Sequence, residues 1–348
     1  MLNHKSKIYL AIAVIFMAVI LLVFGLLNMF KTNSGSDQAP EEVIQIDDNQ
    51  PRHPLSGHIL TEEDGDFFPI AIMIDNAYDI RPQHGLAKAD IIYEALAEGN
   101  ITRLMAIFDS RQDIDKIGPV RSARNYYMDW AEEYGGVYIH VGGSPQALGI
   151  INTYDFVNID QIGAGEIYFW RDENLWAPHN VFTSDSNWLR VGEIKEVDNI
   201  DSNVSWNFVA VDDNAQYPLP LNFNLDFSAA YRVDWRFNAK LLAYQRWQTD
   251  DKFLYDNGEQ ARADNIIVQI VSARIVDAKE RRTMDNKTDG QAFIFNKLGM
   301  VEGQWRYENN RTRFFDSEGN EFKLVPGKTW VEVLPDLEDL IIYENDPA

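Results

Sequence analysis

The sequence predicts an α/β (α+β) amino-terminal domain followed by a β-rich carboxyl-terminal domain, with a single transmembrane helix in front of both. Three observations support this prediction. The first part of the chain holds a long uncharged run, residues 58–200 alternate between apolar runs and helix-start signals, and the rest consists of short aromatic-rich runs. With 348 residues, 45% of them hydrophobic, the chain is long enough for about two domains with sizeable cores.

Residues 1–30 are predicted to be a cytoplasmic stub and an uncleaved signal anchor. Lys5 and Lys7 precede the stretch Ile8–Phe30, which carries no charge. A helix over this stretch is about 34 Å long, enough to cross a bilayer. A cleaved signal peptide is the alternative, but it has a shorter apolar core and a small-residue cleavage site. The positive-inside rule puts the amino terminus in the cytoplasm and the bulk of the chain outside the cell, in a single pass of the cell membrane.

Residues 31–57 are predicted to be a disordered linker, because they are polar, acidic and proline-containing without a sustained period. The whole chain has a formal net charge of −23 and no cysteine. So acidic a surface repels nucleic acid, and we expect no nucleic-acid partner. Without cysteine we expect neither disulfides nor attachment through a lipid-modified cysteine. Any cluster of arginines is conspicuous against this background.

The segment before residue 110 is predicted to form a β-hairpin, with a helix as the alternative. The dipeptide Gly99-Asn100 between two apolar runs is a two-residue turn signal, and it pairs Leu96 with Arg103. Alternation then defines two faces. The charged face carries Glu94, Glu98 and Arg103, with Leu96 and Met105. The face expected in the core carries Tyr93, Ala95, Leu104, Ala106 and Phe108. A longer loop would break this pairing.

A helix is predicted to open at Gly118-Pro119 and to close at Gly135-Gly136, which puts Arg121 and Arg124 in or near its first turn. These arginines would face the positive end of the helix dipole, so a partner must offset their charge. The partner is either a carboxylate of the hairpin, in an internal ion pair, or an anionic ligand held by the arginines and by free backbone N–H groups.

Residues 136–150, GVYIHVGGSPQALGI, predict a strand, a glycine turn and a helix. Ser144 is expected as the N-cap and Pro145 as the first helical residue. Gly142 and Gly143 would let backbone amides converge on an anion. Ser144 as a catalytic nucleophile is the alternative, but the G-x-S-x-G motif is absent. His179, within the aromatic segment YFWRDENLWAPHNVF, is a further candidate for ligand binding.

Residues 201–348 contain alternating aromatic-rich runs such as YRVDWRF, NIIVQIV and TWVEVLP, separated in several places by glycine, asparagine or proline. This pattern predicts a β-rich barrel or sandwich. The tryptophans of this region could form a sugar-stacking surface, but most are expected in its core. They are Trp206, Trp235, Trp247, Trp305 and Trp330.

Four segments together resemble the YerB-type lipoprotein family of Gram-positive bacteria: RPQHGLAKADIIYEALAEGNITRLMAIF, IGPVRSAR, HVGGSPQAL and LVPGKTWVEVLP. The resemblance extends over nearly all of the chain after the linker. It implies a two-domain extracytoplasmic protein of the cell envelope whose activity is not established. Many members of that family carry a lipid-modified cysteine near the amino terminus, where this chain has its predicted anchor instead.

The first functional hypothesis is a membrane-tethered extracytoplasmic binding or regulatory module. Its partner would be an anionic cell-wall polymer or a membrane-bound wall-synthesis enzyme, and the arginines would contact it. The predicted ligand-binding residues are Arg81, Glu94, Glu98, Arg103, Arg121, Arg124, Gly142, Gly143, Ser144 and His179.

The second hypothesis is a cell-wall glycan hydrolase or lyase that uses Glu94 and Glu98 as paired carboxylates. Arg103 on the same face would hold both ionised, which disfavours the general acid that such chemistry needs, so no catalytic residue is assigned. No cofactor and no metal are expected, because His84, His140 and His179 are scattered and the sequence has no H-E-x-x-H motif or nucleotide-binding loop.

Overall fold

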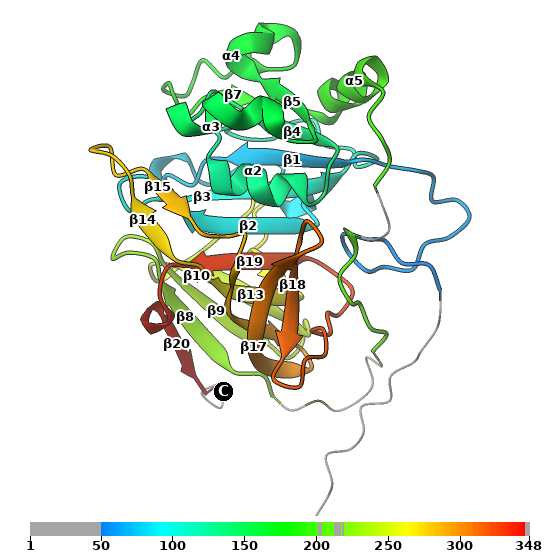
Figure 1. Ribbon diagram of the computed structural model, residues 1–348, viewed down its shortest axis with the longest axis vertical. Helices are drawn as coiled ribbons and strands as arrows, with labels where there is room; N and C mark the ends of the chain where they lie inside the picture. Colours follow the sequence, from blue (N-terminus) through cyan, green and yellow to red (C-terminus); the bar gives the residue numbers. More distant parts are fainter. Residues whose placement is uncertain (1–49, 201–203, 212–216, 218, 345–348) are drawn as a thin grey trace, which may run out of the picture. The chain divides into compact units, whose positions relative to one another are not determined.

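The computed structural model describes residues 50–200, 204–211, 217 and 219–344 (Figure 1). The predicted anchor in residues 1–30 lies outside the described residues, as does most of the predicted linker. Within the described ranges, no helix combines the length and the apolar character needed to cross a membrane. The linker boundary was predicted too late, because Leu55 is fully buried and Ser56 is 5% exposed.

The amino-terminal half combines strands and helices, as predicted. Its strands are β1 (Pro69–Ile74), β2 (Ile91–Leu96), β3 (Thr102–Asp109), β4 (Val137–His140), β5 (Val157–Asp160), β6 (Trp170–Arg171) and β7 (Val181–Phe182). Its α-helices are α2 (Asn125–Glu132), α3 (Pro145–Ile150), α4 (Gln161–Ala164) and α5 (Asp185–Lys195). Every residue of β1, β2 and β3 is buried, because these strands lie inside a sheet that is covered on both faces.

The carboxyl-terminal half is β-rich, as predicted. Its strands are β8 (Asn222–Asp226), β9 (Arg232–Asn238), β10 (Ala243–Gln248), β11 (Asp251–Lys252), β12 (Arg262–Ala263), β13 (Asn265–Ile270), β14 (Ala273–Ile275), β15 (Arg282–Met284), β16 (Asp289–Asn296), β17 (Gly299–Glu308), β18 (Arg311–Asp316), β19 (Thr329–Leu334) and β20 (Leu340–Tyr343).

One mixed sheet of ten strands contains strands of both halves, in the order β18-β17-β16-β13-β19-β2-β3-β1-β4-β5 (Figure 1). The two halves meet where β19 pairs in parallel with β2, with Glu332 opposite Glu94. The described residues accordingly fall within a single compact unit. The predicted division near residue 201 therefore separates two segments of sequence that share one sheet.

A second sheet of six strands packs on the carboxyl-terminal part of the first. Its order is β11-β10-β9-β8-β20, and β12 also pairs with β10. Aromatic rings fill the space between the sheets: Phe223 stacks on Phe295 at 3.9 Å, and Trp235 meets the edge of Trp330 at 5.3 Å. The expectation that most tryptophans of this half belong to the core is confirmed for Trp206, Trp235, Trp305 and Trp330, which are at most 5% exposed.

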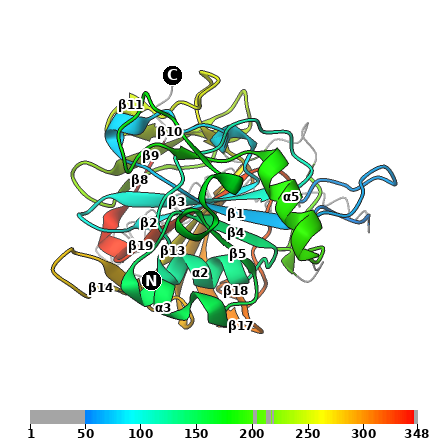
Figure 2. The same ribbon diagram turned by 90° about the horizontal axis from the view of Figure 1, so that it is seen from above.

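Helix α2 covers the face of β2 and β3 that is turned away from the six-stranded sheet (Figures 1 and 2). Trp130 of the helix stacks on Tyr93 of β2 at 5.1 Å between ring centroids. The hydroxyl of Tyr126 donates to the carbonyl of Leu96 over 2.8 Å. Tyr126 combines a large apolar ring with a hydrogen bond to the sheet, so it helps to fix the position of the helix as well as burying its surface.

The hairpin formed by β2 and β3 has the predicted turn but not the predicted register. Gly99 and Asn100 both have positive φ, +61° and +58°, as a tight hairpin turn requires. The amide of Ile101 donates to Glu98, but the carbonyl of Ile101 accepts from Ala97. Ala97 and Glu98 thus both lie opposite Ile101, and this two-to-one pairing is a β-bulge.

The bulge shifts the pairing by one residue, so that Ala95, and not Leu96, lies opposite Arg103. Glu94 lies opposite Leu104 and therefore projects from the other face. The prediction that Glu94 and Arg103 share a face was wrong. Arg103 is on the side of α2, and Glu94 is on the side of the six-stranded sheet.

The helix α2 begins later than predicted, with Arg124 as its N-cap residue. The residues before it are extended, because the ends of two strands take their backbone hydrogen bonds. The amide of Arg121 donates to Met73 over 2.8 Å, and its carbonyl accepts from Val141 over 3.0 Å. The arginines therefore precede the helix and do not lie in its first turn. The predicted end at Gly135-Gly136 is correct to within a few residues.

An ion pair between Glu94 and Arg246 lies buried between the two sheets, with a distance of 2.6 Å and no exposure of either side chain. Glu94 also accepts from the hydroxyl of Thr102 over 2.6 Å. The guanidinium of Arg246 lies 4.2 Å from the ring centre of Phe253 and 4.8 Å from that of Trp330. Two charges in such an apolar place are tolerated only because they satisfy each other.

A second carboxyl group, that of Glu332, lies next to this pair and accepts from the indole N–H of Trp235 over 2.8 Å. Burial raises the pKa of Glu332 well above its ordinary value, and the charge of Glu94 raises it further. One arginine cannot balance two carboxylates in a dry core. Glu332 is therefore the neutral member of the group, and Glu94 is the charged one.

Two substitutions test whether Glu94 is the charged carboxyl group and Glu332 the neutral one. Arg246→Met is expected to lower the free energy of unfolding by about 3–5 kcal/mol, because it leaves the Glu94 carboxylate buried without a cation. Glu332→Gln is expected to lower it by about 1 kcal/mol or less, because a neutral amide replaces a neutral carboxyl and keeps an acceptor for Trp235. Urea unfolding at pH 7 measures both. Losses of equal size would contradict the assignment of charge.

Candidate functional site

The candidate site lies at one edge of the large sheet, where several parallel strands end. Strand β1 runs parallel to β4, and β4 runs parallel to β5. Strands β1 and β2 are each antiparallel to β3, so β2 shares their direction. Their carboxyl ends bring together Asp75, Glu98, Gly142 and Asp160. Ligands of open α/β sheets bind at edges of this kind.

Glu98 is held between two arginines, an arrangement called here the Glu98 clamp (Glu98, Arg103 and Arg124). Glu98 Oε1 accepts from Arg103 Nη2 over 3.0 Å, and Glu98 Oε2 accepts from Arg124 Nε over 3.1 Å. Arg103 also donates to the carbonyl of Ser122 over 3.0 Å, and Arg124 to that of Ala123 over 2.6 Å. The internal ion pair that the sequence left open therefore exists, with Glu98 as the carboxylate.

The clamp keeps Glu98 ionised. Burial by itself would raise the pKa of Glu98, but the charges of Arg103 and Arg124 outweigh burial and lower this pKa to about 2. Burial lowers the pKa of Arg124, and the neighbouring charge of Arg103 lowers it further. Two guanidinium groups face one carboxylate, so the clamp carries one unbalanced positive charge.

The clamp forms one wall of a cavity of about 350 Å³. The loop between β14 and β15 also lines the cavity and contributes Lys279 and Arg281, of which Arg281 pairs with Asp277 over 3.0 Å. Three cationic side chains and one carboxylate thus line this space. The full lining consists of Glu98, Ser122, Arg124, Gly143, Ser144, Pro145, Lys279 and Arg281.

The glycine turn reaches this cavity through Gly143, but only part of the turn can meet a ligand. The amide of Gly142 donates to the carboxylate of Asp160 over 2.7 Å, so it is already occupied. Gly143 lines the cavity. Ser144 caps α3 by accepting from the amide of Ala147 over 3.1 Å, with Pro145 at the helix start, which confirms the capping prediction. Nothing in this geometry supports Ser144 as a nucleophile.

A second charged group at the same edge consists of Asp75, His179 and Arg121. Asp75 Oδ2 lies 2.5 Å from Nδ1 of His179 and 2.9 Å from Nε of Arg121. Asp75 is 4% exposed and also accepts from the amide of Ala77 over 3.0 Å. Burial lowers the pKa of Arg121, and the carboxylate of Asp75 opposes this effect. The group therefore holds Arg121 and His179 beside the clamp through one shared carboxylate.

Two of the predicted site residues lie elsewhere. Glu94 is enclosed between the sheets, and Arg81 lies against the aromatic residues Tyr231 and Phe253 of the six-stranded side. For Glu94 the cause is the register of the hairpin, which turns this side chain away from Arg103. The predicted residues that the sheet edge does bring together are Glu98, Arg103, Arg121, Arg124, Gly142, Gly143, Ser144 and His179.

The sequence reasoning missed Lys279 and Arg281, which are distant in the chain from the other lining residues. The signal was present as the short basic run KERR at residues 279–282, which is unusual in a chain with a net charge of −23. The described residues contain no group of three or more histidine and acidic side chains arranged to hold a metal ion.

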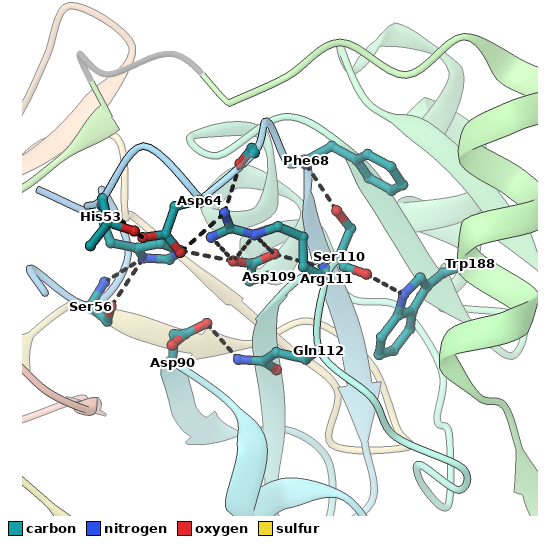
Figure 3. A network of polar contacts seen from close by, with 12 residues as sticks. His53, Ser56, Asp64, Phe68, Asp90, Asp109, Ser110, Arg111, Gln112 and Trp188 are labelled. Atoms are coloured by element: carbon teal, nitrogen blue, oxygen red, sulfur yellow. Dashed lines mark hydrogen bonds and ion pairs between the residues drawn. The ribbon is translucent and has the colours of Figure 1, made fainter. Parts of the chain in front are cut away.

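A separate buried network resembles a Ser–His–Asp arrangement (Figure 3). Ser56 Oγ lies 3.0 Å from Nδ1 of His53, and Nε2 of His53 lies 3.0 Å from Asp109 Oδ2. However, the backbone amide of Ser56 also donates to Nδ1, and Arg111 binds the same carboxylate through Nε over 2.9 Å. All members except Arg111 are buried. The network therefore has a structural role, because it holds residues 53–56 against the end of β3.

These features define a protein with a mixed α/β half and a β-rich half that share one sheet, and with a cation-lined cavity at the edge of that sheet. Two family models match it. The model described as protein of unknown function (DUF3048) N-terminal domain matches residues 55–198, and the corresponding C-terminal domain model matches residues 223–331.

The chain is 31% identical over 301 residues to a Bacillus subtilis (strain 168) protein described as "Putative lipoprotein YerB", covering 84% of this chain and 89% of that protein. It is also similar to the crystal structure of the YerB protein from Bacillus subtilis, with a TM-score of 0.76, 28% identity, and coverage of 85% of this chain and 100% of that one. The chain belongs to the YerB (DUF3048) family, which confirms the resemblance seen in its motifs.

The clamp predicts a pH-dependent effect of Glu98→Gln. The pKa of Glu98 is about 2 in the folded protein and ordinarily 4.5, so its contribution to stability is present above about pH 4.5 and is lost as the pH falls toward 2. Urea unfolding should show a less stable variant at pH 7 and a difference that narrows below pH 4.5. The exposed substitution Glu63→Gln serves as the control. A difference independent of pH would contradict the role of the clamp.

Proposed function

We propose that this chain is a membrane-tethered protein of the cell envelope that binds an anionic component of the cell wall in the cavity beside the Glu98 clamp. The observation that carries this proposal is the lining of the cavity. Three cationic side chains face one carboxylate there, on a chain whose net charge is −23. A positive site on an acidic protein selects its ligand by position and geometry, because the overall field repels anions.

The location in the envelope is supported by the family. The Bacillus subtilis relative carries the description "Putative lipoprotein YerB", and lipoproteins are attached to membranes through lipid. In the present chain, the predicted anchor in residues 1–30 would serve the same purpose, with a cytoplasmic amino terminus and the folded part outside the cell. The alternative partner is a membrane-bound wall-synthesis enzyme that presents an acidic group to the same cavity.

The cavity has the properties of a small anion site. Its volume of about 350 Å³ is at the lower end of the range for ligand sites, which suits one phosphate or carboxylate with part of its sugar. Arg124 is fixed by Glu98 and by a backbone carbonyl, so little side-chain entropy is lost when it meets a ligand. Lys279 and Arg281, which line the same cavity, would add further cationic contacts to the anion.

The hydrolase alternative has no such support. Glu94 is fully buried, and its side chain lies on the face of the sheet opposite to that of Arg103. It therefore cannot flank one glycosidic bond together with Glu98. Glu98 is held ionised at a pKa of about 2, whereas a general acid needs a raised pKa. The geometry thus favours binding over catalysis by this pair.

Titration of the purified full-length protein in detergent with teichoic-acid fragments and muropeptides tests the proposal. Binding of the anionic fragments is expected to weaken as salt increases, and to weaken about tenfold or more in Arg124→Ala and in Lys279→Ala. Lys240→Ala removes a cation outside the cavity and should leave the affinity unchanged. Absence of binding by the unaltered protein, or full affinity in Arg124→Ala, would refute the proposal.

A further inference from the structure

A second cavity, of about 390 Å³, lies around Arg81. It is formed by the 3-10 turn Tyr78–Ile80 after β1 and by the end of β10 with β11 and the residues that follow. It shares no lining residue with the cavity at the Glu98 clamp. The full lining consists of Tyr78, Asp79, Arg81, Pro82, Gln248, Asp251, Lys252, Phe253 and Leu254.

Arg81 has no carboxylate partner among the described residues. Its guanidinium donates to the carbonyl of Asn76 over 2.9 Å and to Oδ1 of the same residue over 3.2 Å. The nearby carboxylate of Glu94 is already paired with Arg246. Burial and, to a smaller extent, the positive charge of Arg246 lower the pKa of Arg81 to about 10. A bound anion would give this guanidinium the direct ionic partner that it lacks among the described residues.

Gln248 supplies a second unused donor. Its side chain is buried, and its Oε1 accepts from Arg246 Nη1 over 3.0 Å, which fixes the orientation of the amide. The amide nitrogen Nε2 has no hydrogen-bond partner among the described residues, and Gln248 lines the cavity. A buried N–H group without an acceptor is unfavourable. Arg81 and Gln248 thus line the same cavity, the first as a cation without a carboxylate partner and the second with a buried N–H group without an acceptor among the described residues.

The remaining lining indicates the kind of anion. The lining carries two cations, Arg81 and Lys252, and two carboxylates, Asp79 and Asp251, so a singly charged anion meets less repulsion there than a doubly charged one. The rings of Tyr78 and Phe253 lie 5.6 and 5.7 Å from the guanidinium of Arg81 and form an apolar wall together with Leu254. A ligand with one carboxylate and an adjacent apolar group matches both features.

We infer that the Arg81 cavity binds the carboxyl terminus of a peptide whose last residue is apolar. Arg81 and the amide of Gln248 hold the carboxylate, and Tyr78, Phe253 and Leu254 hold the side chain. This site is independent of the cavity at the Glu98 clamp, because the two take different anions and share no residue.

Isothermal titration of the full-length protein in detergent with three probes tests the inference. N-acetyl-phenylalanine is expected to bind, whereas its amide, which has the same shape without the charge, is expected to bind about tenfold or more weakly. Phenyl phosphate is expected to bind more weakly than the carboxylate. Equal binding of acid and amide would overturn the inference, and so would no binding of the acid at about 10 mM. Tighter binding of phenyl phosphate would overturn the choice of a carboxylate.

Variants locate the binding. Arg81→Met should reduce the affinity for N-acetyl-phenylalanine about tenfold or more, because it removes the cation but keeps the length of the side chain. Tyr78→Ala should weaken binding and leave the fold intact, because Tyr78 is 65% exposed. This second variant still tests the inference if Arg81→Met does not fold. Arg232→Gln removes an exposed cation of the same sheet, paired with Asp250, and should bind normally. Unchanged affinity in Tyr78→Ala and Arg81→Met would overturn the inference.

Discussion

The ion pair between Glu94 and Arg246 is the interaction on which the rest of the structure depends. It joins β2 of the mixed half to β10 of the β-rich half inside a space otherwise filled by aromatic rings. Neither residue could be buried without the other. The pair therefore requires the two halves to meet in one relative position. Through Asn76, which donates to Glu94 and accepts from Arg81, it also helps to fix the position of Arg81.

The charged side chains of β2 and of the turn that follows it lie on both faces of the large sheet. Strand β2 sends Glu94 toward the six-stranded sheet, and the bulge after it lets Glu98 turn toward Arg103 and Arg124. Arginines that are close in sequence are consequently divided between two places with different surroundings. One is a cavity lined by Arg124, Lys279 and Arg281, and the other is a partly aromatic cavity whose arginine, Arg81, has no carboxylate partner among the described residues.

Local chemistry made much of this predictable, and distant contacts made the rest unpredictable. The turn at Gly99-Asn100, the cap at Ser144 and the aromatic core follow from residues within a few positions of each other. The bulge does not, because it is stabilised by Glu98 reaching Arg124, which lies 26 residues further along the chain. The start of α2 likewise depends on strands β1 and β4, whose ends take the backbone bonds of the preceding residues.

The pairing of β19 with β2 has a consequence for how the family's two matched segments can be treated. A cut between residues 198 and 223 would leave β2 and β19 each with a bare edge of backbone donors and acceptors. Such edges recruit other chains and promote aggregation. The two segments are thus modules of sequence but not of folding, and genetic exchange between relatives would have to carry both together to keep a soluble product.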